Sequence, residues 1–194
     1  MTRDRIFTAA KAIFDREGLA GLSVRAVAKA VGLTPMAIYR HYADKDALVD
    51  ALMLDGFAEW QRIAAAIRTK DPVLWLRRLL DAYLDFAIAR PHRFDAAFIL
   101  PARGARKYPR DFAAGRSPVI ASVFVHIERA KREGRLRGAP TLEIALTMSA
   151  LAQGMVSMHR ARRFSGDKEL RTLYRAVIAH GIASFARPPG RKSG

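Results

Sequence analysis

The stretch that decides the fold is GLSVRAVAKAVGLTPMAIYRHY, residues 21–42. Its apolar positions predict two short helices, at about 24–31 and 35–42, joined by a tight turn. Ser23 and Thr34 stand immediately before the two helices, where a side-chain oxygen can accept a hydrogen bond from an unpaired backbone N–H group. Capping signals therefore precede both helices of the pair.

The turn between these helices has a steric signature. Ala28 is small enough for the second helix to cross close over the first, and Gly32, four residues later, suits a backbone with positive φ. An aliphatic residue, Ile38, follows six positions further on. This spacing is typical of a helix-turn-helix, whose second helix enters the major groove of DNA. Its small core is predicted to contain Val27, Val31, Leu33 and Ile38.

The overall charge fits a nucleic-acid partner but does not locate the site. The 194 residues carry a formal net charge of +16, which favours polyanions. Residues 1–46 hold eight basic and five acidic groups, a net charge of only +3, so most of the excess lies further along the chain. The chain has no cysteine, which excludes disulfides, thiolate catalysis and cysteine-ligated zinc.

Helical periodicity continues along most of the chain, and no segment shows the two-residue alternation of a strand. The predicted fold class is all-α, with a helix-turn-helix near the N-terminus, and a disordered tail is expected at 188–194. The first helix is expected to end at Gly18.

Prolines and glycines set the expected helix ends further along. Asp71-Pro72 and Arg90-Pro91 mark two breaks, because proline disfavours helix in the residue before it. A segment rich in proline, glycine and basic residues, 101–118, is expected to be a long loop. The remaining helices are expected at about 45–67, 76–87, 94–100, 118–134, 141–163 and 167–186.

Exposed side chains around the second helix of the pair are expected to face DNA. Pro35, Met36 and Ala37 begin this helix, and their short or apolar side chains suit contact with thymine methyl groups. Hydroxyl, imidazole and cationic groups nearby suit phosphates. Arg3 or Arg5 could form a short arm into the minor groove, and Tyr42 is expected in the core. The predicted DNA-binding residues are Ser23, Arg25, Thr34, Pro35, Met36, Ala37, Tyr39, His41 and Lys45.

The stretch from Ala9 to Ala51 resembles the DNA-binding domain of the TetR family of transcriptional regulators. The resemblance rests on SVRAVA at 23–28, GLT at 32–34, IYRHY at 38–42 and KDAL at 45–48, with Tyr42 where Phe is commoner. It implies a homodimer with an N-terminal three-helix DNA-binding head, at 1–46, and a C-terminal helical domain for ligand binding and dimerisation, at 47–187. An effector bound in the second domain alters operator affinity. The resemblance also implies phosphate contacts for Thr34, Tyr39, His41 and Lys45. Residues 83–98 resemble one of the ligand-domain subgroups of the family.

Apolar faces of the helices expected at 76–87 and 141–163 could enclose an effector pocket. A mostly apolar pocket would suit a hydrophobic or aromatic effector. The same side chains are also what an ordinary helical core contains. The predicted ligand-binding residues are Tyr83, Phe86, Phe94, Phe98, Met148, Leu151, Met155 and His159.

The last two helices are expected to form the dimer interface. Two-fold pairing would place two heads about 34–36 Å apart on a pseudo-palindromic operator. A wide apolar stripe near the end of the chain supports this interface, but the stripe could instead close the core of a single subunit. Its residues are Leu170, Leu173, Tyr174, Val177, Gly181, Ile182 and Phe185.

The function expected from these features is a ligand-responsive regulator, with repression as its mode. Its partners are double-stranded DNA, a second copy of the chain and a small-molecule effector, with no cofactor, metal or membrane and a cytoplasmic location. Catalysis is not expected, because Asp81 and Asp85 stand beside Arg77 and Arg78 and the histidines lack metal-binding spacing. The alternatives are a sequence-independent DNA-binding protein and a helical small-molecule carrier.

Overall fold

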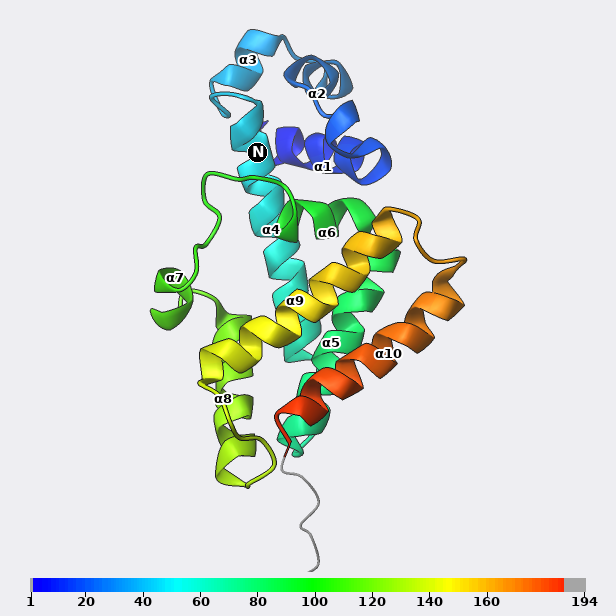
Figure 1. Cartoon of the computed structure of the whole chain (residues 1–194). Helices are drawn as coiled ribbons and strands as arrows, with labels where there is room; N and C mark the ends of the chain where they lie inside the picture. The colour runs from blue at the N-terminus through cyan, green and yellow to red at the C-terminus, as the bar shows by residue number, and fades with distance from the viewer. Residues whose placement is uncertain (1, 187–194) are drawn as a thin grey trace, which may run out of the picture. The chain divides into compact units, whose positions relative to one another are not determined.

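The computed structural model describes residues 2–186, which form ten helices and no strand (Figure 1). A single antiparallel bridge joins Leu136 and Ala186. The predicted all-α fold class is confirmed, and the predicted disordered tail at 188–194 lies outside the described residues. The helices are α1 (Thr2–Gly21), α2 (Val24–Val31), α3 (Pro35–Tyr39), α4 (Lys45–Ala65), α5 (Pro72–Ala89), α6 (Pro91–Phe98), α7 (Arg110–Ala113), α8 (Pro118–Arg132), α9 (Thr141–Arg160) and α10 (Asp167–Ser184).

Several element boundaries differ from the sequence prediction: α5 begins at Pro72 rather than 76 and α6 at Pro91 rather than 94, directly after the two predicted breaks. α3 ends at Tyr39 rather than 42, because the chain turns back on the carbonyl of Ile38, which accepts from the N–H groups of His41 at 2.9 Å and Tyr42 at 3.0 Å. The predicted loop at 101–118 is interrupted by the four-residue α7, which is too short to show a periodicity. The bounds of α1 reach Gly21, but the backbone leaves the helical conformation at Gly18 (φ 65°, ψ −158°), so the predicted end is present as a kink.

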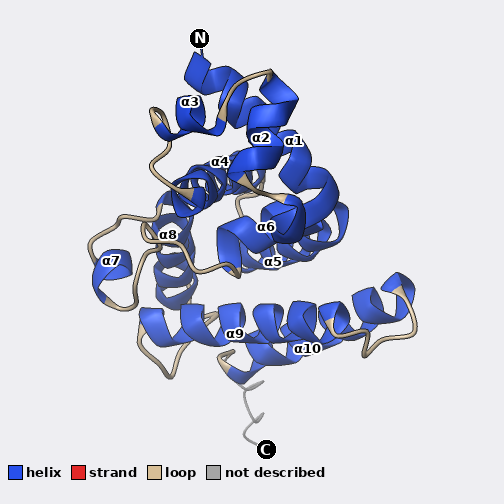
Figure 2. Ribbon diagram, turned by 90° about the horizontal axis from the view of Figure 1, so that it is seen from above, coloured by secondary structure: helices blue, strands red, loops and turns tan. Residues whose placement is uncertain are grey.

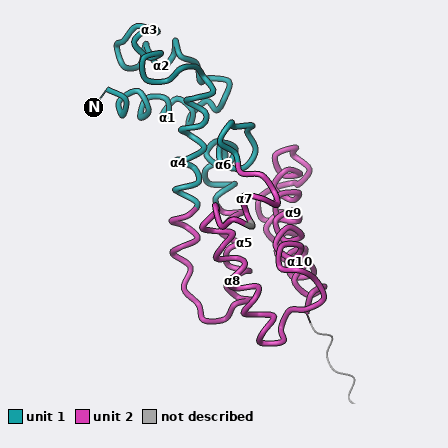
Figure 3. Tube along the Cα trace, turned by 90° about the vertical axis from the view of Figure 1, so that its left-hand side faces the viewer, with its two compact units in different colours: residues 1–60, 86–105 teal, residues 61–85, 106–194 magenta. Residues whose placement is uncertain are grey.

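The described residues divide into two compact units (Figure 3). Unit 1 holds the chain up to Trp60 together with Phe86–Ala105, and unit 2 holds Gln61–Asp85 and the residues from Arg106 onward. The division falls within α4 and α5. Unit 1 therefore contains α1, α2, α3 and α6, and unit 2 contains α7 to α10.

Unit 1 is built around a small apolar core. α1 packs against α2 and α6, and α2 packs against α3. The predicted core residues Val27 and Ile38 are fully buried, Val31 and Leu33 pack against them, and Tyr42 is buried as expected. The core consists of Ile6, Ala10, Ile13, Phe14, Leu22, Val24, Val27, Ala28, Ile38, Tyr42, Leu48, Val49, Leu52 and Ala96, the last of which comes from α6.

In unit 2, α9 lies between α8 and α10 in packing order and runs side by side with α10 (Figures 1 and 2). Three residues of the predicted dimer stripe, Leu170, Tyr174 and Ile182, are buried within the unit. The Tyr174 hydroxyl donates a hydrogen bond of 2.7 Å to the carbonyl of Leu80. Part of the stripe therefore closes the core of unit 2.

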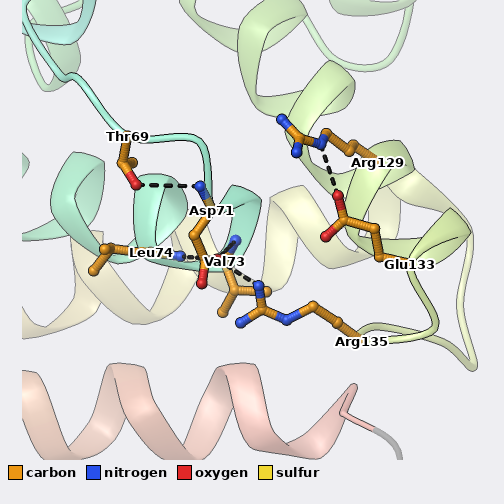
Figure 4. Close-up of polar contacts among 7 residues, drawn as sticks. All are labelled: Thr69, Asp71, Val73, Leu74, Arg129, Glu133 and Arg135. Carbon is orange, nitrogen blue, oxygen red and sulfur yellow. Dashed lines mark hydrogen bonds and ion pairs between the residues drawn. The ribbon is translucent and has the colours of Figure 1, made fainter.

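An aspartate caps α5 at the predicted break before Pro72 (Figure 4). One carboxylate oxygen of Asp71 accepts from the backbone N–H groups of Val73 and Leu74, each at 2.9 Å. The same oxygen lies 2.6 Å from the Arg135 guanidinium, which is the main cause of a lowered pKa of Asp71. The break is thus a helix start with its free N–H groups satisfied.

Candidate DNA-binding site

Side-chain caps fix the start of both helices of the predicted pair. The Ser23 hydroxyl accepts from the N–H of Ala26 at 3.1 Å, and the Thr34 hydroxyl accepts from the N–H of Ala37 at 3.3 Å. Because each hydroxyl accepts in its cap, its own hydrogen stays available as a donor. The structure confirms both predicted caps.

The turn between α2 and α3 depends on Gly32. Its backbone has φ 68° and ψ 33°, and its N–H is directed at the last carbonyls of α2. The next N–H, of Leu33, donates to the carbonyl of Ala28 at 2.9 Å. A residue with a Cβ would pay about 1–2 kcal/mol for this left-handed conformation. The positive φ predicted from the sequence is confirmed.

α3 presents one face to the core and the other to solvent. Ile38 is fully buried, whereas Met36 is 68% and Tyr39 is 47% exposed. Of the other predicted DNA-binding residues, Ala37 and Lys45 are half-buried, and those that are exposed are Ser23, Arg25, Thr34, Pro35 and His41. The nine residues lie on α2, α3 and α4 or in the residues that join and cap them, and the apolar Pro35 and Met36 stand near the middle of the set. The sequence prediction omits Arg40, which is exposed between Tyr39 and His41.

Cationic side chains of unit 1 make internal contacts near this face. The Lys45 ammonium donates to the carbonyl of Leu19 at 3.1 Å, which leaves two of its three hydrogens for other acceptors. Arg3 lies 5.4 Å above the ring centre of Tyr42, and Arg5 donates to the carbonyl of Val31 at 3.4 Å. Both arginines belong to α1, so the predicted arm is wrong: this segment is helical rather than extended.

Acidic side chains stand at the edge of the same face. The Asp44 carboxylate caps α4 by accepting from the N–H of Ala47 at 2.8 Å. The guanidinium of Arg103 lies 2.7 Å from Asp44 and 3.0 Å from Asp46. The hydrogen bond from Arg103, followed by that from Ala47, holds the pKa of Asp44 below its usual value. Sequence reasoning missed this contact, because Arg103 is one of several basic residues in the segment 101–118.

A second arginine fixes α6 to the rest of unit 1. Arg93 donates to both oxygens of Asp15 on α1, at 2.8 and 2.5 Å, and to Glu59 on α4 at 2.5 Å. These side chains are only 13–31% exposed. The hydrogen bond with Arg93 lowers the pKa of Asp15, and the bond with Asp15 is the main cause of a raised pKa of Arg93.

The predicted pocket residues fall in different units. In unit 1, Phe86, Phe94 and Phe98 form an aromatic cluster with Trp60, in which the Phe94 and Phe98 ring centres are 5.0 Å apart. In unit 2, burial raises the pKa of Tyr83, whose hydroxyl bonds the side chain of Gln153. The other predicted pocket residues in unit 2 are Met148, Leu151, Met155 and His159.

Two surface hollows of unit 2 involve other residues than these. One is lined by Ser165, Gly166, Lys168, Glu169, Thr172 and Leu173. The other is lined by Arg77, Asp81, Arg175, Ile178 and Ala179. The effector pocket therefore stays a prediction.

The carboxylates considered for catalysis are engaged in ion pairs. Asp85 pairs with Arg171, and Asp81 lies 3.5 Å from Arg175. Within residues 2–186, no group of histidine and acidic side chains is arranged to hold a metal ion. Among the described helices, none has the length and apolar character that a membrane crossing requires.

Comparisons with known proteins match both parts of the chain. Residues 6–52 match the family described as "Bacterial regulatory proteins, tetR family", and residues 76–185 match "Tetracyclin repressor-like, C-terminal domain". HTH-type transcriptional regulator Rv1816 of Mycobacterium tuberculosis is 26% identical over 166 residues, which are 80% of this chain and 66% of that relative. The regulator YobS of Bacillus subtilis is 29% identical over 51% of this chain, and the match spans about half (52%) of its length.

Solved structures share the fold at low sequence identity. A protein of unknown function from Rhodococcus sp. RHA1 has a TM-score of 0.75 at 22% identity, over 96% of both chains. A TetR family transcription regulator from Marinobacter aquaeolei VT8 has a TM-score of 0.69 at 20% identity, again over 96% of both chains. With the two family matches, which together take in most of the sequence, the chain belongs to the TetR family of bacterial transcriptional regulators.

Proposed function

We propose that this regulator is a ligand-responsive repressor that binds a pseudo-palindromic operator as a homodimer. The observation that carries the proposal is the exposed face of α3: Met36 and Tyr39 point away from the core while Ile38 is fully buried. Functionally, residues 1–46 serve as the DNA-binding domain and 47–187 as the regulatory and dimerisation domain. Its site of action is the cytoplasm, where its DNA target lies.

Contacts with DNA are divided by chemistry along this face. Pro35, Met36 and Ala37 meet base edges, where apolar groups distinguish the thymine methyl. The surrounding donors meet phosphates, which set position and most of the salt dependence. These phosphate-contacting residues are Ser23, Arg25, Thr34, Tyr39, Arg40, His41 and Lys45.

Pairing of two chains follows from the small size of the head. One short recognition helix contacts few base pairs, so a specific operator requires two heads held by a two-fold interface. On α9 and α10, Met158 is 48% and Leu173 is 44% exposed. These apolar side chains support an interface formed by the last two helices.

Effector binding is assigned to unit 2. Met148 and Met155 supply buried apolar surface, the ring of Tyr83 is half-buried, and the Tyr83 hydroxyl and His159 supply polar groups. This lining suits a hydrophobic or aromatic effector with one or two polar atoms. Phe86, Phe94 and Phe98 fill the aromatic cluster of unit 1.

The test is selection of DNA fragments from the genome of the source organism by the full-length chain, followed by competition against random duplex. We expect a pseudo-palindromic fragment to win by at least about 10³-fold. Equal affinity for selected and random duplex would instead favour the sequence-independent DNA-binding protein. Absence of binding to any duplex would favour the small-molecule carrier. Repeating the selection with candidate effectors identifies the ligand that releases the fragment.

Two substitutions assign the contacts on the selected fragment. Lys45→Ala should weaken binding to every sequence and reduce the slope of log K against log salt by about 1. Met36→Ala should alter base preference more than overall affinity. An unchanged salt slope contradicts the phosphate role of Lys45, and an unchanged preference contradicts the base contact of Met36.

A further inference from the structure

At the start of α4, acidic side chains that stabilise the helix lie beside a lysine that is proposed to bind phosphate. Asp44 and Asp46 flank Lys45, a residue proposed to contact phosphate, and Asp50 follows one turn later. Acidic groups at a helix N-terminus stabilise the helix through the cap and the helix dipole, as Asp44 does with the N–H of Ala47. The same carboxylates repel a polyanion that approaches Lys45.

Arg103, in the loop that follows α6, contacts all three aspartates. Its guanidinium lies 2.7 Å from an oxygen of Asp44 and 3.0 Å from an oxygen of Asp46. Its backbone N–H donates to Asp50 at 2.9 Å. The loop is therefore fixed to α4 through both its side chain and its main chain, and the nearby Leu100 packs against the core of unit 1.

We propose that Arg103 is a positioning residue for DNA binding, which neutralises Asp44 and Asp46 so that phosphates can approach Lys45 and His41. This inference rests on the proposed function, because it requires DNA at the exposed face of α3. The DNA-binding surface then includes a residue that lies 59 positions after the aspartate it compensates. Arg103 acts through the carboxylates rather than through a contact of its own with DNA.

Because Arg103, Asp44 and Asp46 are exposed, their effect on DNA binding can be distinguished from an effect on folding. The side chains of Arg103, Asp44 and Asp46 are 58%, 43% and 69% exposed. Ion pairs this exposed add little to stability. Their charges nevertheless act on phosphates within the screening length, about 10 Å at 0.1 M salt. Removal of the guanidinium should therefore change DNA affinity much more than it changes unfolding.

The test compares Arg103→Gln in two backgrounds of the full-length chain: wild type and Asp44→Asn/Asp46→Asn. Asparagine keeps the cap of α4, so the second background removes charge without removing the cap. The probes are a fragment selected from genomic DNA and a random-sequence duplex. At about 0.1 M salt we expect Arg103→Gln to weaken both complexes about 5-fold in the wild-type background and less than about 2-fold in the asparagine background.

The matched control is Arg135→Gln. Arg135 pairs with Asp71, the cap of α5 in unit 2, so this variant loses the same charge from the same kind of contact. We expect its DNA affinity to stay within about 2-fold of wild type. Thermal unfolding of both variants should stay close to that of wild type, because both ion pairs are exposed.

Three results would overturn the inference. An equal loss in both backgrounds, with the salt slope lowered by about 1, means that Arg103 contacts phosphate directly. Unchanged affinity in the wild-type background means that the aspartates do not repel DNA. A wild-type chain that prefers no genomic fragment overturns the proposed operator instead, and the Arg103 comparison is then made on the random duplex. A chain that binds neither duplex overturns both.

Discussion

Two aspartates cap helices in the same way in different units, with different surroundings. Asp44 caps α4 in unit 1 and Asp71 caps α5 in unit 2, and each is also bound by an arginine from a distant segment, Arg103 or Arg135. In both, the arginine is the first cause of a lowered pKa of the carboxyl. Only Asp44 stands beside Lys45 at the proposed DNA-binding face. Both aspartate–arginine pairs cap a helix, but only the pair of Asp44 with Arg103 also changes the charge beside the proposed DNA-binding face.

The difference extends to how each unit is held together. Unit 1 has two positions that tolerate little change: Gly18, whose φ is positive and whose Cβ would lie against His92, and the largely buried Arg93. The glycines with positive φ in unit 2, at 115, 134 and 138, have open space around the position of a Cβ. Unit 2 is held by apolar contacts along α8, α9 and α10, and pairs such as Arg171 with Asp85 are more exposed. Single substitutions should therefore destabilise unit 1 more than comparable substitutions destabilise unit 2.

The two tryptophans allow each unit to be followed separately. Trp60 packs in the aromatic cluster of unit 1, stacked on Phe86. Trp75 stacks on His126 in unit 2, with ring centres 3.9 Å apart. Trp75→Phe leaves a fluorescence reporter of unit 1, and Trp60→Phe leaves a reporter of unit 2.

The largest effect is expected from Gly18→Ala. Gly18 has φ 65° and ψ −158°, a region that is almost exclusive to glycine, and a Cβ there would lie 2.8 Å from two ring atoms of His92. We expect a loss of about 3 kcal/mol in the free energy of unfolding, measured by urea titration with the Trp60 reporter.

Gly166→Ala is the control for this change in unit 2. Gly166 is extended, and nothing lies within 4 Å of the position of its Cβ. We expect an effect within about 0.5 kcal/mol, as for a substitution away from packed features. Equal effects at the two glycines would contradict the contrast between the units.

Arg93→Met should produce the next largest effect. It leaves Asp15 and Glu59 without their shared partner, and we expect a loss of about 2 kcal/mol in urea unfolding. The matched variant is Arg171→Met in unit 2, whose pair with Asp85 is 37% and 58% exposed. That variant should lose less than about 1 kcal/mol. Comparable losses in the two variants would show that burial does not make the Arg93 contacts more stabilising than the exposed pair.

Lowering the pH should reduce the stability that the contact between Arg93 and Asp15 contributes. Arg93 holds the pKa of Asp15 below its usual value. A carboxyl with a lowered folded pKa contributes stability that is present above its unfolded pKa, about 3.9, and is lost as the pH falls through the folded value. Urea unfolding at about pH 7 and pH 3 should show a smaller acid-induced loss in Arg93→Met than in wild type. An identical loss would mean that Asp15 does not respond to Arg93.

These contrasts also explain what the sequence could predict. The caps at Ser23 and Thr34 and the turn at Gly32 are local signals, because the partner of each lies within a few residues. The exposed face of α3 follows directly from them. That is why the bounds of α2 and nine candidate DNA-binding residues can be proposed from the sequence alone.

Long-range charge pairs could not be predicted in the same way. The chain has 34 basic and 18 acidic residues, so each arginine has many possible partners. Arg93 finds Asp15 at a separation of 78 residues, and this pairing brings α6 into unit 1. Arg103 lies in a basic segment whose sequence shows neither a helical periodicity nor a helix-capping signal at this position. Its role is visible only when α4 and the loop after α6 are seen together.

A smaller effect is expected from Tyr174→Phe in unit 2. The Tyr174 side chain is fully buried and its hydroxyl donates to Leu80 at 2.7 Å. Removal of the donor should reduce the free energy of unfolding by about 1.5 kcal/mol, followed with the Trp75 reporter. Tyr108→Phe is the control, since Tyr108 is 45% exposed, and should have almost no effect. A neutral Tyr174→Phe would mean that this bond adds nothing to apolar packing.

The smallest effects compare two serine caps, one in each unit. The Ser23 oxygen accepts from Ala26 at 3.1 Å at the start of the eight-residue α2, and the Ser117 oxygen accepts from Ile120 at 3.4 Å at the start of the fifteen-residue α8. We expect Ser23→Ala to lose about 1 kcal/mol and Ser117→Ala only a few tenths. The shorter helix has fewer other contacts to hold its first turn, whereas α8 is also held by α9.

Ser23→Asn separates the cap from the proposed phosphate contact, because asparagine caps as well as serine but places an amide where the hydroxyl was. We expect this variant to recover the stability lost in Ser23→Ala while its affinity for the selected fragment differs from wild type. If Ser117→Ala destabilises the chain as much as Ser23→Ala, local signals matter equally in the two units. The greater sensitivity of unit 1 would then have to come from Gly18 and Arg93 alone.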